Sequence, residues 1–426
     1  MLVFKFGGAS VKNASAVKNV AKILRLFSKE KKVVVISAMG KTTNLLEEIV
    51  LALKEKNHQR FDILKEECYE FHLAILNELF SEKHFKIYQE LDAIFEKLDR
   101  KKEDFFSDNY AFEYDQIVSL GEVISTLIVD AFLREQAELS VWVDARKLIR
   151  TDHLYRDASV DWKKTEELIV TQVKPLLVNS DTIITQGFVG HTSEGFTTTL
   201  GREGSDYTAG IFAYCLNAQN VTIWKDVPGM LNADPKWFDD TIKLDKISFK
   251  EAIELAYYGA SVIHPKTIKP LQNKNIPLYV KSFVDPNASG TVIQESAEFD
   301  HLIPSFIFKM KQVLFSITPR DFSFIVEENL SRIFDELSKI GAKINLMQNS
   351  ALSFSFALDQ EKIDIQEVLN IFHDEYEIRY NQHLELVTIR HYNAETIERV
   401  TEKKEMILEQ KTRQTIRILM KDSLIS

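Results

Sequence analysis

Basic side chains stand next to glycines at two places in this chain where phosphate chemistry could occur. The first is Lys5, which lies near the end of a short apolar run and is followed by Gly7 and Gly8. Glycines let backbone N–H groups approach an anion closely, and a lysine supplies a point charge, so this corner could hold nucleotide phosphates. Taken alone, a strand–turn–helix corner with a surface lysine is the commoner explanation, because short glycine motifs often occur by chance.

The second place is the segment 201–206, which reads Gly-Arg-Glu-Gly-Ser-Asp. Arg202 has the planar fork that suits a carboxylate, and Ser205 and Asp206 open a predicted helix. An Asp206 carboxylate facing Lys5 could hold that ammonium in register with a migrating phosphoryl group. Such a transfer depends more on positioning and charge neutralisation than on covalent chemistry. The simpler alternative is that Asp206 only caps its helix.

Three other polar positions could contact a small substrate. Ser37 and Thr43 border a loop after a second apolar run, where hydroxyls and backbone amides could hold a carboxylate. Thr43 also fits the start of a helix, and both interpretations can hold together. Glu122 lies on an otherwise apolar helix and could pair with an ammonium, although a solvated helix face is the more ordinary explanation.

The strand end and turn from 224 to 236 carry further charged residues. Lys225, Asp226 and Lys236 could line a nucleotide pocket, or they could be ordinary loop residues. The chain contains neither the GxxxxGK[ST] spacing of a Walker A loop nor an HExxH metal motif. We therefore expect no resident metal site, and any Mg²⁺ would arrive with a nucleotide and be held partly by its phosphates.

The elements that must position these residues alternate between strand and helix. Apolar runs at 2–6 and 33–37 flank a stretch with helical periodicity, which predicts a βαβ unit. The alternation continues to about residue 300, so we expect residues 1–300 to form a three-layer αβα domain with a mainly parallel sheet. Residues 44–106 lack Gly and Pro and are predicted to be a largely helical insertion.

The pattern changes from about residue 305. We predict two small α+β modules of the βαββ type, at 305–382 and 383–426, with the second abbreviated. Modules of this size have exposed sheet edges and small cores, so we expect them to pair across subunits and give a homodimer or a higher homo-oligomer.

Composition narrows the function classes. The 426 residues contain 53 Lys and Arg against 63 Asp and Glu, a net charge of −10, which argues against a nucleic-acid binder. The two cysteines predict no disulfide framework. No run reaches the ~18 apolar residues of a membrane span, and the N-terminus lacks a signal-peptide pattern. We expect a cytoplasmic protein that does not bind membranes.

Taken in order, these segments resemble the motifs of aspartokinases, within the amino-acid kinase family. The segment 5–10 (KFGGAS) is similar to the family's KFGGTS, and 201–206 (GREGSD) is similar to GRGGSD. The segment 37–44 (SAMGKTTN) is similar to the family's second glycine and Thr-Asn loop. The segment 256–265 (AYYGASVIHP) is similar to its AxxGAKVLHP. The C-terminal modules resemble paired ACT domains.

The resemblance implies ATP-dependent phosphorylation of the β-carboxylate of L-aspartate, the first step of lysine, threonine and methionine biosynthesis. It implies that Lys5 and Asp206 are catalytic. Aspartate would be bound by Thr43, Glu122, Arg202 and Ser205. ATP would be bound by Lys5, Gly7, Gly8, Ser37, Lys225, Asp226, Leu231, Lys236 and Ser261.

Four residues depart from the family pattern. They are Lys225 in place of Thr, Glu203 in place of the second glycine of GRGGSD, Leu231 in place of Tyr, and Ser261 in place of Lys. Lys225 could supply the positive charge that Ser261 lacks. Glu203 brings an additional anion near the site and could modulate aspartate or metal binding.

Two other functions remain open from the sequence. One is a related carboxylate kinase, and the other is a catalytically silent amino-acid sensor that keeps the ligand sites. The ACT-like modules imply an amino-acid effector, and the sequence does not discriminate lysine from threonine or show that the second module is functional. Because no dehydrogenase pattern follows the second module, we expect a monofunctional enzyme.

Overall fold

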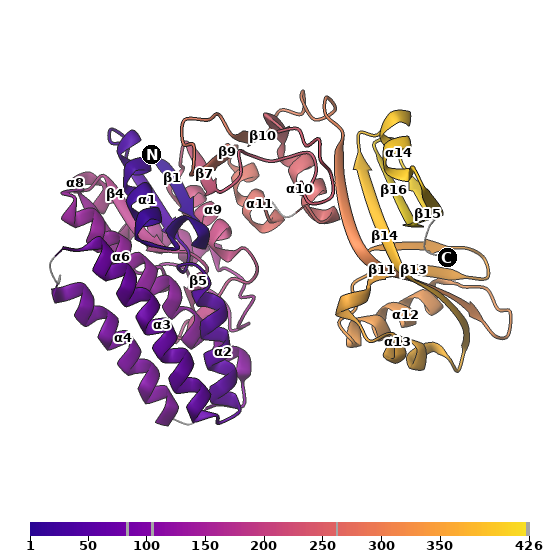
Figure 1. Cartoon of the computed structure of the whole chain (residues 1–426), viewed down its shortest axis with the longest axis horizontal. Helices are drawn as coiled ribbons and strands as arrows, with labels where there is room; N and C mark the ends of the chain where they lie inside the picture. The colour runs from indigo at the N-terminus through magenta and orange to yellow at the C-terminus, as the bar shows by residue number, and fades with distance from the viewer. Residues whose placement is uncertain (82–84, 104–105, 261–262, 423–426) are drawn as a thin grey trace. The chain divides into compact units, whose positions relative to one another are not determined.

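The computed structural model describes residues 1–81, 85–103, 106–260 and 263–422, which form two compact units (Figure 1). The larger unit comprises Met1–Met230, Lys243–Ala256 and Ser261–Asp300. The smaller unit comprises Leu231–Ile242, Tyr257–Ala260 and His301–Ser426.

An eight-stranded sheet forms the centre of the larger unit, in the order β3-β4-β2-β1-β7-β9-β10-β8. All neighbouring strands are parallel except β9 and β10. The strands are β1 Leu2–Phe6, β2 Lys32–Ile36, β3 Ser140–Val143, β4 Thr182–Gln186, β7 Asn220–Lys225, β8 Lys246–Ser248, β9 Leu278–Ser282 and β10 Thr291–Gln294, with a separate ribbon of β5 Val189–His191 and β6 Thr197–Thr199.

Helices cover this sheet on both faces, as buried parallel strands require. The helices of the chain up to residue 300 are α1 Ala14–Leu26, α2 Thr42–Lys54, α3 His58–Leu79, α4 Phe85–Glu103, α5 Tyr110–Val118, α6 Leu120–Glu135, α7 Trp162–Gln172, α8 Leu176–Asn179, α9 Gly204–Leu216, α10 Phe249–Tyr258 and α11 Pro265–Asn273, with short 3₁₀ turns at Gly8–Val11 and Ala145–Lys147.

The alternation of side chains along β1 assigns its residues to the two faces. Leu2, Phe4 and Phe6 belong to the core formed with α1 and the α2–α6 helices. The odd residues Val3 and Lys5 point to the opposite face, which α9 covers. The three-layer αβα architecture with a mainly parallel sheet is therefore confirmed, and it turns Lys5 toward the start of α9.

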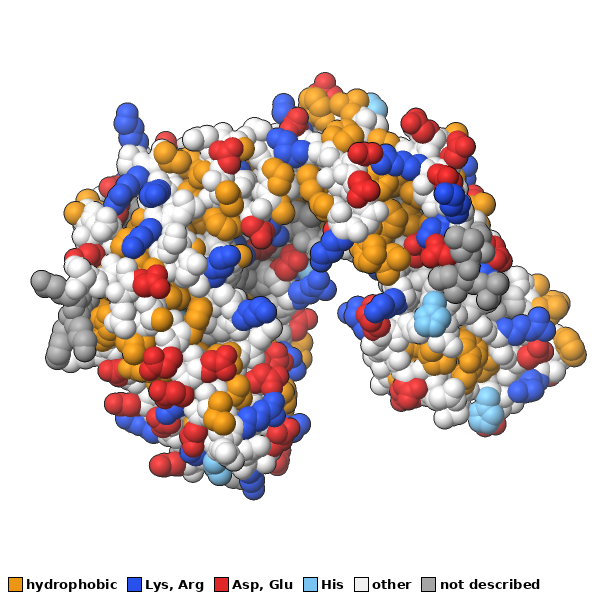
Figure 2. Space-filling view, in the orientation of Figure 1, with side chains coloured by type: hydrophobic (Ala, Val, Ile, Leu, Met, Phe, Trp, Pro, Cys, Tyr) orange, Lys and Arg blue, Asp and Glu red, His pale blue; other side chains and the backbone are white. Residues whose placement is uncertain are grey.

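The stretch predicted as a helical insertion contains α3 and α4 and most of α2. On the face shown in Figure 2, acidic and basic side chains are interspersed over these helices. Lys102 pairs with Asp62 at 2.7 Å, and Lys65 pairs with Asp99 at 2.8 Å, across α3 and α4. Pairs this exposed add little stability, so the buried apolar faces of the helices hold the bundle together.

The helical stretch Tyr110–Glu135 is long and apolar enough, by length and composition, to cross a membrane. Of its most apolar window, 78% is buried inside the protein. It is thus packed as the core helices of a globular domain are packed.

A six-stranded antiparallel sheet forms the smaller unit, in the order β12-β13-β11-β14-β16-β15. Its elements are β11 Ser305–Pro319, α12 Glu327–Lys339, β12 Leu346–Asn349, β13 Phe354–Asp359, a 3₁₀ turn at Gln360–Lys362, α13 Ile365–Phe372, β14 Tyr376–Arg390, α14 Ala394–Thr401, β15 Lys404–Lys411 and β16 Thr415–Asp422.

Two long strands run through both halves of this sheet. β11 and β14 have 15 residues each and pair with one another from Ser305–Arg390 to Pro319–Tyr376. β13 pairs with the C-terminal half of β11, whereas β16 pairs with the C-terminal half of β14. The predicted module boundary at 382/383 falls inside β14, so the two α+β modules share a strand.

The turn after β1 brings two backbone segments into close contact. A Cβ on Gly8 would lie 2.8 Å from the carbonyl oxygen of Ala38 and 3.0 Å from that of Gly40. A Cβ on Gly7 would meet only the flexible end of Lys5, at 3.3 Å. Gly8 therefore allows the loops after β1 and β2 to pack together.

We expect Gly8→Ala to lower the melting temperature by several degrees, since overpacking against fixed backbone costs about 1–3 kcal/mol. Gly7→Ala is the matched control, because Gly7 has a φ of −79° that suits any residue. Scanning calorimetry measures both variants. Equal shifts for the two would contradict a specific role of Gly8.

Candidate active site

A cavity of about 460 Å³ opens where β1, β2 and β7 end and α9 begins. Side chains that are far apart in the sequence meet in this cavity. The carboxyl ends of the strands, where it lies, are the usual place for a ligand in an open α/β sheet. Its lining comprises Lys5, Ser37, Thr43, Tyr114, Glu122, Arg156, Phe188, Gly201, Arg202, Glu203, Gly204, Ser205, Asp206 and Lys225.

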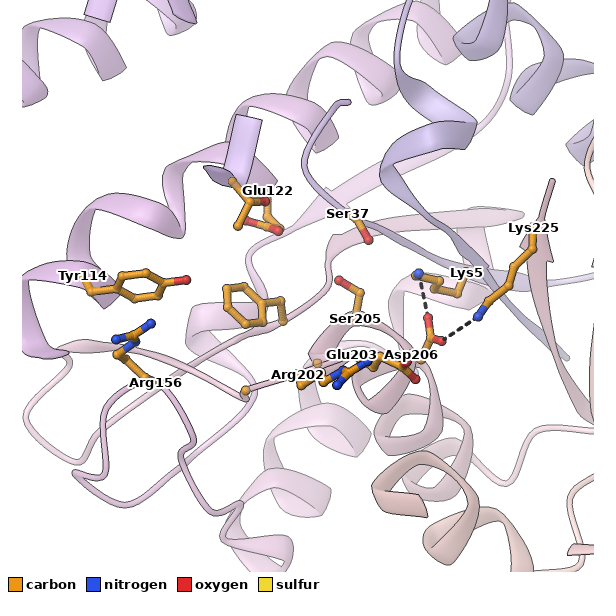
Figure 3. Close-up of a pocket in the computed structure, with 14 residues that line it drawn as sticks. Lys5, Ser37, Tyr114, Glu122, Arg156, Arg202, Glu203, Ser205, Asp206 and Lys225 are labelled. Carbon is orange, nitrogen blue, oxygen red and sulfur yellow. Dashed lines mark ion pairs between the residues drawn. The ribbon is translucent and has the colours of Figure 1, made fainter. Parts of the chain in front are cut away.

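Two lysines share one carboxylate at one end of this cavity (Figure 3). The Nζ of Lys5 lies 2.6 Å from Oδ1 of Asp206, and the Nζ of Lys225 lies 3.9 Å from Oδ2. Asp206 is 2% exposed and Lys5 is 9% exposed. Two ammonium groups around one carboxylate leave a net positive charge, and this charge in a mostly buried place favours an anionic ligand.

The first turn of α9 is held close to the sheet by small residues. A Cβ on Gly187 would collide with Ser205, and a Cβ on Gly204 would lie 2.7 Å from the ring of Phe188. Backbone N–H groups at a helix N-terminus attract anions. The close approach thus places Ser205, Asp206 and these N–H groups at the cavity wall.

Glu203, which precedes α9, adopts a left-handed conformation with a φ of 55°. Glycine adopts this conformation at no steric cost, whereas another residue is strained. The Oε2 atom of Glu203 is buried and has no hydrogen-bond partner within the described residues. The departure from glycine at this position therefore places a carboxylate oxygen at the cavity wall, available to a cation.

Glu122 is 3% exposed at the first turn of α6. Its Oε1 accepts a hydrogen bond from the N–H of Ala38 at 3.3 Å, and its Oε2 has no partner among the described residues. Burial raises the pKa of Glu122 to about 8, against the opposing effects of that hydrogen bond and of Lys5. The alternative of a solvated helix face is wrong, and the carboxyl faces the cavity (Figure 3).

Three lining residues were not identified from the sequence: Tyr114, Arg156 and Phe188. Figure 3 shows Tyr114 and Arg156 at the opposite end of the cavity from Lys5 and Lys225. The guanidinium of Arg156 lies 4.3 Å from the centre of the Tyr114 ring. The one available signal was that Tyr114 lies eight residues before Glu122, or about two helical turns.

A buried acid holds the turn that carries Arg156. Asp115 accepts the N–H of Arg156 at 3.0 Å and the hydroxyl of Thr199 at 2.7 Å. Burial raises the pKa of Asp115 to about 6. Arg156 has a φ of 70°, so this hydrogen bond stabilises a left-handed residue at the cavity wall.

The structure brings together eight of the residues predicted for the site: Lys5, Ser37, Thr43, Glu122, Arg202, Ser205, Asp206 and Lys225. Gly7 and Gly8 form the adjoining turn. Asp226 is exposed after β7 and does not line the cavity. Leu231 and Lys236 lie in the segment Leu231–Ile242 of the smaller unit, and Ser261 lies outside the described residues.

Comparison with known proteins identifies the class to which this fold and cavity belong. The model of the amino acid kinase family matches residues 1–282. The chain therefore belongs to the amino acid kinase family.

Within that family the chain is an aspartokinase. It is 34% identical to the lysine-sensitive aspartokinase 3 of Escherichia coli over 360 residues, which cover 84% of this chain and 78% of the relative. It is 31% identical to the chloroplastic aspartokinase 3 of Arabidopsis thaliana, covering 86% and 66%. The crystal structure of Escherichia coli aspartokinase III with lysine and aspartate matches with a TM-score of 0.82 and 28% identity, covering 100% of this chain and 96% of the other. The structure of that enzyme with aspartate and ADP matches with a TM-score of 0.79.

The raised pKa of Glu122 predicts a pH-dependent stability. The folded chain keeps the Glu122 proton up to about pH 8, whereas the unfolded chain loses it near 4.5. The folded state therefore loses stability as the pH rises through these values, by roughly 5 kcal/mol over the whole range.

Glu122→Gln should remove this loss, because a neutral amide keeps the hydrogen bond from Ala38. We expect the variant to unfold at a higher temperature than the natural protein at pH 8.5, and at a similar temperature at pH 5. Calorimetry at the two pH values measures this difference. If the difference in melting temperature between the two proteins does not change with pH, Glu122 is not a buried carboxyl that stays protonated.

Proposed function

We propose that the cavity around Asp206 transfers the terminal phosphoryl group of ATP to the β-carboxylate of L-aspartate, giving ADP and 4-phospho-L-aspartate. The observation that carries this assignment is that Lys5, Lys225 and Asp206 meet in the cavity that also holds Arg202 and Glu122. One end of the cavity suits phosphate, and the rest presents groups for both charges of an amino acid.

Aspartate has one ammonium and two carboxylates, and the cavity offers partners for each. We assign the ammonium to Glu122, whose Oε2 has no protein partner within the described chain. The carboxyl is protonated while the cavity is empty, and an arriving ammonium would favour its ionised form. Arg202, with Thr43 and Ser205, would bind carboxylate oxygens. Arg156 at the far end supplies a second guanidinium that could take the α-carboxylate.

The chemical step needs no strong base in this arrangement. A carboxyl such as that of aspartate is ionised at neutral pH, with an ordinary pKa of about 3.9, so its oxygen can attack phosphorus directly. The charge that moves to the leaving oxygen is met by Lys5 and Lys225. Asp206 keeps both ammonium groups in place, so the site is organised before the reaction begins.

Mg²⁺ would arrive with the nucleotide. Within the described residues no group of three His, Cys, Asp or Glu side chains could hold a metal ion. The buried, unpartnered Oε2 of Glu203 fits a cation, so we propose that Glu203 holds Mg²⁺ together with phosphate oxygens. The ion would supply further positive charge to the phosphates.

The remaining nucleotide contacts are proposals carried by the family motifs. We assign phosphate contacts to Gly7, Gly8 and Ser37, which lie at or beside the cavity. Asp226, Leu231, Lys236 and Ser261 would contact the rest of ATP.

The smaller unit would provide regulation and self-association. Its ACT-like halves, proposed at 305–382 and 383–426, would bind an amino-acid effector, lysine or threonine. The Escherichia coli relative was crystallised with lysine, which supports this proposal. Phe322 is 78% exposed and Phe324 is 65% exposed, and both suit contact with a second copy in a homodimer.

We place the enzyme in the cytoplasm.

The assignment is tested with purified protein, MgATP, L-aspartate and hydroxylamine, which traps the acyl phosphate as a hydroxamate. We expect aspartate-dependent hydroxamate, and a fall of about 10³-fold in kcat for Lys5→Met because a charge aimed at the transferred group is lost. Lys29→Met, at an exposed position, is the control. Bound aspartate without product would instead indicate a sensor.

A second prediction separates the roles of the two lysines. Lys225→Ala should raise the Michaelis constant for ATP at least tenfold and leave that for aspartate within about twofold. The physical reason is that Lys225 adds charge at the phosphate end, where Asp206 orients it. Steady-state kinetics with each substrate varied in turn measures both constants. Equal effects on the two would count against this role.

A further inference from the structure

A second cavity of about 520 Å³ lies in the larger unit, between α7, α9 and α11. It shares no lining residue with the cavity around Asp206. Its size falls in the range of small-molecule sites. Nothing in the proposed aspartate kinase reaction uses it.

Three aromatic side chains form one wall of this second cavity. The ring of Trp162 packs edge-on against Tyr214 with centroids 5.1 Å apart, and against Tyr207 at 6.2 Å. The indole N–H and both phenol hydroxyls have no hydrogen-bond partner in the part of the chain that the structure describes. Burial raises the pKa of Tyr207 to about 12, so its hydroxyl remains a donor at neutral pH.

The opposite wall is positively charged. Lys266 and Lys269 stand about one turn apart on α11, and no acidic side chain of the described residues lines the cavity. Lys266 forms an ion pair with Asp157. Lys269 is exposed and makes no ion pair with any described residue, so its charge is available to a ligand. Ring faces, free donors and a free ammonium together match a planar aromatic molecule that carries a negative charge.

Residues at the second cavity are also neighbours, along the chain, of residues that line the active cavity. Tyr207 directly follows Asp206 in α9. The carboxylate of Asp157, the partner of Lys266, packs so closely on Gly201 that a Cβ there would collide with it. Asp157 in turn follows Arg156, which lines the active cavity. An anion that bound Lys266 would compete with Asp157 for its ammonium. The turn that carries Arg156 and Asp157 would then lose this ion pair.

We propose that the cavity between α7, α9 and α11 binds a small planar aromatic anion, and that the bound anion draws Lys266 away from Asp157 and so changes aspartate binding. The chemistry is shared by aromatic carboxylates and by nucleoside monophosphates. The part that concerns aspartate rests on the proposed function, whereas the binding site itself does not.

Calorimetric titration of the full chain with indole-3-acetate tests the site. We expect saturable binding of one molecule per chain, at least tenfold weaker binding of the neutral indole-3-acetamide, and at least fivefold weaker binding of indole-3-acetate to Lys269→Met. Lys163→Met removes an exposed charge from α7 outside the cavity and should change the affinity less than twofold.

Adenosine monophosphate, titrated in parallel, distinguishes a nucleotide from an aromatic carboxylate. Its binding supports this site only if Lys269→Met weakens it. The proposal is overturned if neither probe binds saturably, or if Lys269→Met leaves the binding of both unchanged.

The link to the active cavity is tested by titrating aspartate with and without saturating probe. We expect at least a threefold change in the dissociation constant of aspartate, and the same factor for the probe when aspartate is saturating, because coupling is reciprocal. Lys266→Met should shift aspartate affinity in the same direction without the probe. An unchanged constant overturns the coupling. If aspartate does not bind at all, the proposed function fails and the probe titration still decides the site.

Discussion

The contact between Lys5 and Asp206 joins the middle strand of the sheet to the first turn of the helix that covers it, and the rest of the cavity depends on this contact. Both groups are almost fully buried. A buried ion pair is costly in desolvation and contributes little to stability by itself. The ion pair instead fixes the position of a carboxylate, which holds ammonium groups at the ends of β1 and β7. The dipole of α9 also attracts an anion to this place.

The sheet explains why such distant residues meet. Parallel neighbours β2, β1 and β7 end at the same edge, so Ser37, Lys5 and Lys225 come together whatever their separation in the sequence. Glycines at 187 and 204 let α9 approach that edge closely. Glu122 reaches the cavity from another direction, on α6, and its Oε2 has no partner among the described residues, which is why we assign the substrate ammonium to it.

Part of the fold and of the cavity could be predicted from the sequence. The alternation of strands and helices predicted the parallel sheet, and strand ends and glycine-bearing loops predicted seven members of the cavity, because both follow from local pattern. Arg156 was missed because its position depends on a hydrogen bond to Asp115 from another segment. The burial of Glu122 could not be predicted from the sequence of its helix, since the groups that cover it are distant in the sequence. Helix α13 was overlooked although Ile365, Val368 and Phe372 follow helical spacing after the cap Asp364.

The two long strands of the smaller unit have a further consequence. Because β11 and β14 each extend through both halves of the sheet, neither half is an independent folding unit. A chain cut between the halves would leave the C-terminal end of β14 without β16, as a long unprotected edge of the kind that drives aggregation. The register of the two strands shifts around Gln312, in the middle of the pair, so a bend between the two halves of the sheet would be concentrated at this irregularity.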